Sequence, residues 1–274
     1  MNRMLLVGGI VAVVAAAACA DVGTGPEVAA AIEFAPFAFP SVVVGDTLRD
    51  SLGVATPIRA IVRNSAGDII TGARPTYLYA DILRDSALRV DSSTGVLVAR
   101  AKVSSGRLAA RIGSALQVIK PFIATIRPDS VVRGTDPSAL IVSLLPDTGR
   151  ARAQGNTTGD LSVRVFNRQG TTTTGVNDWL VSYRLVKPAN PTNDTTRSTF
   201  LVNENLSPSI VDTTGSDGGA ARRVRVRPSL FPAAQGSARV TDTVIVEATV
   251  RYRGQVLRGA PVRIVVPVIR PASQ

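Results

Sequence analysis

Histidine is absent from the 274 residues, cysteine occurs once, and lysine and glutamate occur only three and four times. Without histidine the chain cannot build a Ser–His–Asp or Cys–His nucleophile, or a zinc or haem site with histidine ligands. A single cysteine cannot close a disulfide bond within the chain. Aromatic residues make up only 4% of the sequence, and no nucleic-acid recognition motif occurs, so nothing indicates nucleic-acid binding. We therefore expect no cofactor and no nucleic-acid partner.

Aliphatic residues and arginine are abundant. Hydrophobic residues make up 45% of the chain, enough for one large core or two modest ones, which excludes a wholly disordered polypeptide. The formal net charge of +11 comes almost entirely from 28 arginines. Residues 19–121 carry 11 basic and 9 acidic side chains, whereas residues 122–274 carry 19 and 11. The second half is therefore the part in which we look for an anion-binding surface.

The first 19 residues have the pattern of an export signal. Arg3 is followed by an uncharged stretch of fourteen residues, 5–18, which is shorter than the about 20 residues of a membrane span and typical of a signal peptide. The stretch ends in Ala16-Ala17-Ala18-Cys19, which resembles the lipobox of bacterial lipoproteins. The resemblance implies cleavage before Cys19 and acylation of its thiol and new amino group. Several acyl chains make anchoring stable where one does not.

Residues 1–18 are therefore interpreted as a signal peptide and residues 19–29 as a lipidated tether. In lipoproteins of Gram-negative bacteria, Asp directly after the cysteine tends to hold the protein in the inner membrane. Ala20 at this position thus implies the outer membrane, on its periplasmic or its surface side. Two other interpretations stay open: an ordinary secretory signal peptide cleaved elsewhere, and a plain N-terminal membrane anchor.

The body of the chain predicts β-strands. Apolar and polar residues alternate with period two in five segments, the pattern of a strand with one buried face. Clusters of Gly, Asn, Asp and Ser predict turns at residues 64–68, 91–95 and 212–219. Many short strands between such turns indicate an all-β sandwich fold. The expected inward-facing residues are Ile58, Ala60, Val62, Leu161, Val163, Val165, Trp179, Val181, Tyr183, Leu185, Val224, Val226, Val244, Val246, Ala248, Val250 and Tyr252.

A short internal repeat indicates related units. The spacing N-x-x-G-x-x-x-x-G occurs at residues 64–72 and again, 103 residues later, at residues 167–175. Gly254 and Gly259 repeat its second part. Each copy follows an alternating segment, so we interpret it as a strand–hairpin–strand unit in which glycine permits a tight turn. An offset near 100 residues is about the size of one immunoglobulin-like domain.

Several motifs resemble bacterial immunoglobulin-like domains. Val44-Gly45-Asp46-Thr47, the hairpin at residues 64–72 and the segment Gly95-Val96-Leu97-Val98-Ala99 resemble the group 2 family. Residues 163–176, Trp179 and residues 212–215 more loosely resemble invasin-type domains, in which Trp179 takes the place of the buried core tryptophan. The resemblance implies extracellular display, a stalk or adhesion role, and no catalysis.

Two tandem immunoglobulin-like β-sandwiches are therefore expected after the signal peptide. The first covers residues 30–120 and the second, longer one covers residues 122–270, with the boundary near Lys120 and Pro121.

Catalytic and metal sites have little support. Lys102 lies near Ser104 and Ser105, but a polar strand end explains this group better than a Ser–Lys nucleophile. Residues 212–219, DTTGSDGG, hold two carboxylates but do not match a D-x-D-x-D-G calcium loop. A turn is the favoured interpretation. We expect no metal and no catalytic residue.

Five arginines form the candidate binding surface. Arg223, Arg225 and Arg227 share one face of a predicted strand, and Arg251 and Arg253 share a face of another. If these strands pair, a strip of guanidinium groups results, which suits phosphate and carboxylate groups. The ordinary alternative is a solvated, charged sheet face.

The sequence thus predicts a non-catalytic lipoprotein of the outer membrane, with immunoglobulin-like domains as spacer and adhesion-type interaction modules. Expected partners are the membrane, through the lipid anchor, and an envelope protein or an acidic glycan. The alternative function is a glycan- or polyanion-binding module acting through the arginine-rich face. An enzyme of unrecognised type is the third class, and it would need a pocket with perturbed carboxylates.

Overall fold

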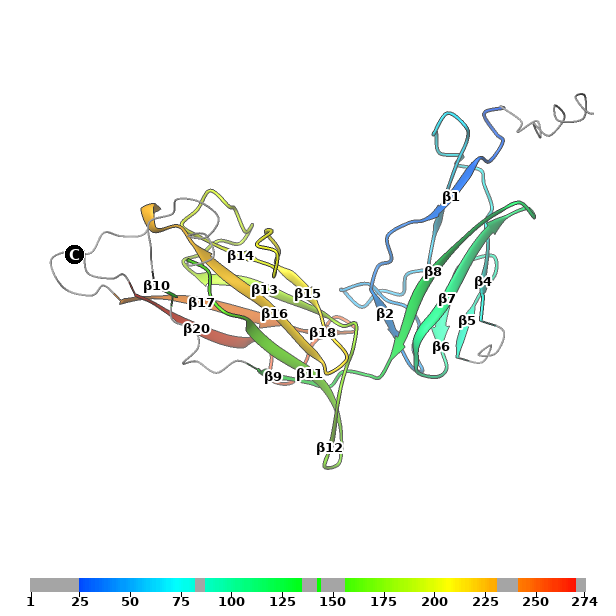
Figure 1. Ribbon diagram of the computed structural model, residues 1–274. Coiled ribbons are helices and arrows are strands. Elements are labelled where there is room, and N and C mark those ends of the chain that lie inside the picture. The colour runs from blue at the N-terminus through cyan, green and yellow to red at the C-terminus, as the bar shows by residue number, and fades with distance from the viewer. Residues whose placement is uncertain (1–24, 82–86, 135–141, 144–155, 231–240, 270–274) are drawn as a thin grey trace, which may run out of the picture.

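The computed structural model describes residues 25–81, 87–134, 142–143, 156–230 and 241–269. Within them the regular structure is β-strand, apart from one 3-10 turn, η3 (Pro228–Leu230). Figure 1 shows two groups of strands side by side, which confirms the predicted all-β class with two tandem sandwiches. In the described part of the chain, no helix has the length and hydropathy to cross a membrane. The predicted signal peptide, Cys19 and most of the tether lie outside the described residues.

The first domain combines one sheet with two ribbons. Its strands are β1 (Ala31–Phe34), β2 (Ser41–Val43), β3 (Ala60–Arg63), β4 (Thr76–Tyr79), β5 (Leu88–Val90), β6 (Leu97–Ala99), β7 (Val103–Ile112) and β8 (Leu116–Thr125). A four-stranded sheet has the order β2-β8-β7-β4, in which β2 and β8 run parallel. Two-stranded ribbons, β1–β3 and β5–β6, complete the domain.

The second domain consists of two larger sheets and a small hairpin. Its strands are β9 (Ser130–Arg133), β10 (Val142–Ser143), β11 (Leu161–Gln169), β12 (Thr172–Gly175), β13 (Leu180–Lys187), β14 (Thr199–Val202), β15 (Val211–Thr213), β16 (Gly219–Val226), β17 (Thr241–Thr249), β18 (Arg251–Tyr252), β19 (Gln255–Val256) and β20 (Val262–Ile269). One sheet has the order β10-β20-β17-β13-β15; the other has the order β12-β11-β16-β14, with β9 also paired to β11. Strands β18 and β19 form a separate hairpin.

The passage between the domains differs from the expected one. Lys120 and Pro121 lie inside β8, where they pair with Leu108 and Arg107 of β7. Strand β2 pairs with β8 only from Ile123 onward, so at Pro121 the strand has one hydrogen-bonded neighbour, a position that tolerates proline. The chain therefore crosses between the domains at residues 126–129, after β8 is complete.

The period-two pattern correctly identified the buried faces. In β11, β16 and β17 the expected apolar residues are buried, and on β16 the same buried face also carries Arg222, which was not expected. In the second domain they meet in one core between the two sheets. Representative members are Val163, Val181, Val224, Val246 and Ile264, each with no exposed surface.

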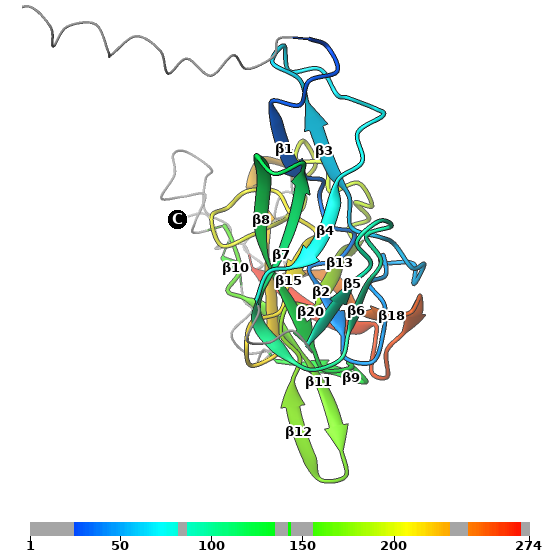
Figure 2. The same cartoon turned by 90° about the vertical axis from the view of Figure 1, so that its right-hand side faces the viewer.

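The repeated hairpin motif has the same structural role in both domains. Strand β3 pairs antiparallel with β1, and β11 pairs antiparallel with β9. Asn64 then donates its side-chain N–H to the Pro26 carbonyl, and Asn167 donates to the Arg127 carbonyl, so each asparagine fixes the segment preceding the first strand of its domain. Gly67 and Gly170 both have positive φ, 89° and 60°. Figures 1 and 2 show that the β11–β12 hairpin projects beyond the rest of its domain.

Candidate functional site

The five predicted arginines form two separate groups. Arg223 and Arg225 lie on β16, and Arg227 follows that strand directly, whereas Arg251 and Arg253 lie in the β18–β19 hairpin. Strand β16 pairs with β11 and β14, and β18 pairs with β19. The two arginine strands do not pair, so the condition for a single guanidinium strip is not met. Whether either group binds a polyanion stays a prediction.

The β16 arginines are engaged in contacts within their own domain. Arg223 forms an ion pair with Asp160 at 2.6 Å. Arg225 and Arg227 lie over the ring of Phe200 at 5.8 and 5.6 Å. Phe200 is directly opposite Arg225 in the β14–β16 ladder and is only 2% exposed. The guanidinium groups of these arginines therefore help to cover an aromatic ring on the outer side of the sheet.

The second group belongs to the junction between the domains. Arg253 Nε donates to Asp46 Oδ2 at 2.8 Å, across 207 positions of sequence. Arg251 donates Nη1 to the Gly254 carbonyl at 2.9 Å and accepts, on its own carbonyl, the indole N–H of Trp179 at 3.1 Å. These contacts hold the β18–β19 hairpin in place.

Asp46 is the polar centre of this junction. It follows β2 in the Val44-Gly45-Asp46-Thr47 turn, and only 6% of it is exposed. Its carboxylate accepts from the Thr47 main-chain N–H at 2.8 Å and from Arg49 Nε at 3.2 Å within the first domain. From the second domain it accepts the Tyr252 hydroxyl at 3.0 Å and Arg253 Nε at 2.8 Å. One buried charge therefore satisfies donors of both domains.

The electrostatics of this cluster favour a charged Asp46. Burial alone would raise its pKa, but the hydrogen bonds from Arg253, Thr47, Tyr252 and Arg49 outweigh burial and lower the pKa to about 2. The pKa of Tyr252 is raised, first by burial and then by its hydrogen bond to Asp46. At neutral pH the cluster is thus an ionised carboxylate with charge-assisted donors, the stronger class of hydrogen bond.

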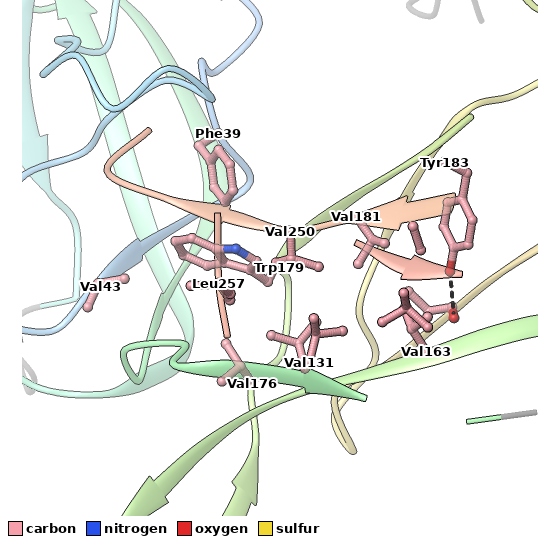
Figure 3. Packing of buried hydrophobic residues seen from close by; sticks show 14 of the residues in the cluster. Phe39, Val43, Val131, Val163, Val176, Trp179, Val181, Tyr183, Val250 and Leu257 are labelled. Atoms are coloured by element: carbon pink, nitrogen blue, oxygen red, sulfur yellow. Dashed lines mark hydrogen bonds between the residues drawn. The ribbon is translucent and has the colours of Figure 1, made fainter. Parts of the chain in front are cut away.

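An aromatic contact accompanies the polar cluster. Phe39, in the segment before β2, lies against Trp179 with ring centroids 4.5 Å apart, and Trp179 meets Tyr252 edge-on at 6.0 Å. Figure 3 shows the Phe39 ring facing the indole of Trp179, above Leu257. Trp179 is 5% exposed. The expected core tryptophan is therefore buried, but at the boundary of the sandwich, where it packs against the other domain.

The two main chains also approach closely at the junction. A Cβ on Gly53 would lie 2.3 Å from the Arg253 carbonyl carbon, and one on Gly254 would lie 2.5 Å from the Leu52 carbonyl oxygen. Nearby, Ser41 Oγ donates to the Asp178 carbonyl at 2.7 Å. The cavity left between the domains at this point is small, about 20 Å³, which is room for about one water molecule. The two surfaces are therefore closely packed.

Residues 214–218 form the predicted turn between β15 and β16. Asp212 is held by Arg222, with Oδ1 and Nη1 2.9 Å apart, and accepts the Ala221 N–H at 2.7 Å. Asp217 accepts the Gly219 N–H at 3.0 Å. Because these carboxylates have internal partners, the structure favours the turn over a calcium loop. In the described ranges no three Asp, Glu or Cys residues are grouped as metal ligands.

Arg222 itself was not anticipated. The strand pattern places it on the core face of β16, opposite Leu161, and it is 9% exposed. Tyr183 donates its hydroxyl to the Ala220 carbonyl at 2.9 Å beside this pair. Burial, followed by the charge of Asp212, raises the pKa of Tyr183. Period-two alternation is the signal that could have identified Arg222, since it shares a face with Val224 and Val226.

Comparisons with known proteins leave the family open. No protein-family model and no curated protein sequence match the chain. Domains 4 and 5 of the S-layer protein SbsC have 12% identity and a TM-score of 0.31, over 89% of this chain and 99% of that chain. Human protocadherin-24 EC1-2 has 12% identity and a TM-score of 0.25, over 90% of this chain and 100% of that one. Likenesses this weak carry no argument, so the assignment of the fold depends on the strand pairing above.

Proposed function

We propose that this chain is a non-catalytic module of the bacterial cell envelope that holds an interaction surface at a fixed distance and angle from its anchor. The observation that carries the proposal is the junction centred on Asp46. A spacer made of two domains keeps its length and direction only if the joint between them resists bending. By default, domains joined by a short, polar contact move relative to each other.

The contacts at this junction are of the kind that resists bending. Asp46 binds two donors on each side, so rotation of one domain would leave a buried charge with unsatisfied bonds, which is costly. The Phe39–Trp179 contact adds apolar burial, and the connection of residues 126–129 is short. Together these features support a stiff two-domain rod.

The membrane anchor is part of the proposal. Support comes from the uncharged residues 5–18, which end in Ala16, Ala17 and Ala18 directly before Cys19. A triacylated Cys19 would attach the module to the outer membrane through the tether that precedes β1. The intact mass of the protein isolated from membranes tests this: it should match a triacylated chain that starts at Cys19, and Cys19→Ser should lose the lipid mass. An unlipidated wild-type protein would contradict the anchor.

A distance measurement between the domains tests the stiff joint. Spin labels are placed through Ser65→Cys in the first domain and Ser229→Cys in the second, both exposed positions, in a Cys19→Ser background. Pulsed electron paramagnetic resonance should give one narrow distance distribution. Asp46→Asn should broaden it, because the neutral amide cannot replace the ionised acceptor.

Asp68→Asn is the matched control, since Asp68 is an exposed carboxylate of the same domain away from the junction. It should leave the distribution unchanged. A broad distribution in the protein with Asp46 intact would contradict the proposal.

A further inference from the structure

An open groove of about 520 Å³ crosses the start of β9. Its lining includes Ser130 and Val132 of β9, Phe166 and Arg168 of β11, and Arg258. This groove involves none of the five arginines predicted from the sequence. It also does not include the contacts of the Asp46 junction.

The two arginines of the groove differ from Arg223 and Arg253 in their partners. Arg223 and Arg253 are each paired with a carboxylate. Arg168 and Arg258 are exposed, and in the described parts of the chain neither forms an ion pair. The guanidinium of Arg168 lies over the Phe166 ring at 5.7 Å. Two guanidinium groups thus border one groove without an internal counter-ion.

The acidic residue of the groove is already satisfied by neutral groups. Asp129 accepts the main-chain N–H of Arg168 and the hydroxyl of Ser130 on its carboxylate. Its own N–H donates to the Phe166 carbonyl at 3.1 Å. The carboxylate therefore braces the backbone of the groove and leaves the Arg168 guanidinium available to a ligand.

The main chain fixes the positions of both arginines. Val131 donates its N–H to the Arg258 carbonyl at 2.9 Å, and Ser130 bridges to Arg258 as a parallel β-bridge. Gly259, at φ +88°, packs so closely that a Cβ there would lie 2.2 Å from the Val131 carbonyl oxygen. The main chains at Arg168 and Arg258 are both hydrogen-bonded to residues 129–131. Binding of a ligand therefore costs little conformational entropy of the backbone.

We propose that this groove binds an anionic glycan, with Arg168 and Arg258 as paired receptors for its carboxylate groups. Guanidinium forks match carboxylate geometry, and Phe166 offers an apolar edge for a sugar ring. An acidic peptide fits less well. Peptides gain affinity by adding a strand to a free edge, but β9 is paired with β11 on one side and bridged to Arg258 on the other.

Titration calorimetry of the full chain in detergent tests this site. The probe is a polygalacturonate oligosaccharide, with neutral dextran and poly-L-glutamate as comparison ligands. We expect binding of polygalacturonate, with weaker binding of poly-L-glutamate and none of dextran. Arg168→Gln and Arg258→Gln should each raise the Kd about tenfold, the usual effect of losing one hydrogen bond to a charged group.

Two control variants distinguish binding at the groove from non-specific attraction of an anion to the positive charge of the protein. Arg223→Gln combined with Arg225→Gln removes two positive charges from β16, twice as many as either groove variant, and should still leave the Kd unchanged. Arg258→Lys keeps the charge but loses the fork and should raise the Kd. Absence of polygalacturonate binding, equal affinity for poly-L-glutamate, or equal loss in the β16 variant would each overturn the glycan site. The stiff junction does not enter this test, so either proposal can fail without the other.

Discussion

The two domains bury their apolar residues to different degrees. In the second domain two sheets face each other, and core residues such as Val181, Val224 and Ile264 have no exposed surface. The first domain has one four-stranded sheet and two short ribbons, and no residue of its strand β1 is fully buried. Phe39 of that domain is covered instead by Trp179 of its neighbour. The comparison teaches that the smaller sandwich depends on the junction for part of its core.

The largest loss of stability is expected at Phe39, because its contact with Trp179 of the second domain is apolar. Phe39→Ala should lower the free energy of unfolding of the first domain by about 3 kcal/mol, because it removes a buried ring and leaves a cavity. It should also change the emission of Trp179, the single tryptophan of the chain. Phe37→Ala is the control, since Phe37 packs on Phe34 and Phe122 within its own domain. Unchanged Trp179 emission in Phe39→Ala would show that the second domain covers the indole by itself.

The polar half of the junction should contribute less and should depend on pH. The pKa of Asp46 is lowered to about 2 from an ordinary value of 3.8. Its contribution, about 2 kcal/mol, is therefore present above pH 4 and is lost as the pH falls toward 2. Urea denaturation at pH 7 and pH 2, followed by Trp179 emission, should show Asp46→Asn to be less stable at pH 7 only. The same difference at both values would contradict the ionised cluster.

A smaller loss of stability is expected at Gly53, where the main chains of the two domains pack closely. Gly67 provides a closely matched control. Gly53 and Gly67 have nearly equal φ, 88° and 89°, but a Cβ on Gly53 would meet the second domain, whereas one on Gly67 would meet nothing within 4 Å. Both alanine variants carry the same backbone strain. Gly53→Ala should cost about 1 kcal/mol more than Gly67→Ala in thermal or urea unfolding. Equal costs would show that the domains separate easily.

The smallest effect is expected at an ion pair outside the junction. Arg184 and Glu247 are 2.7 Å apart, as close as Arg253 and Asp46 at 2.8 Å, and both arginine side chains are exposed, at 69% and 52%. The carboxylates differ, since the Glu247 side chain is 15% exposed and the Asp46 side chain only 6%. Arg184→Gln should change the free energy of unfolding by less than about 0.5 kcal/mol, because water screens such pairs. Arg253→Gln should cost more, since it removes a donor from a buried carboxylate. Equal effects in chemical denaturation would remove the distinction between the two pairs.

Much of the fold could be predicted from the sequence, because strand faces and turns depend on patterns of a few neighbouring residues. Alternation identified the buried faces of β11, β13, β16 and β17, and the asparagine–glycine repeat identified two equivalent hairpins. The boundary near Lys120 and Pro121 followed from a repeat offset of about one domain length, which does not show that β8 continues through a proline with one paired neighbour. The five-arginine surface rested on an assumed pairing of strands, and pairing between distant strands is a property of topology that no local pattern carries.

The sequence by itself determined the strand class, the inward residues and the turn positions, because side-chain period and backbone preference act over a few residues. Only the tertiary structure decided what Asp46 does. In the chain it is a polar residue of a turn motif, 206 positions away from Tyr252. Folding of both domains brings the Tyr252 hydroxyl and the Arg253 guanidinium to its carboxylate. Burial there makes each of these bonds stronger and their loss costly, because little water remains to replace them.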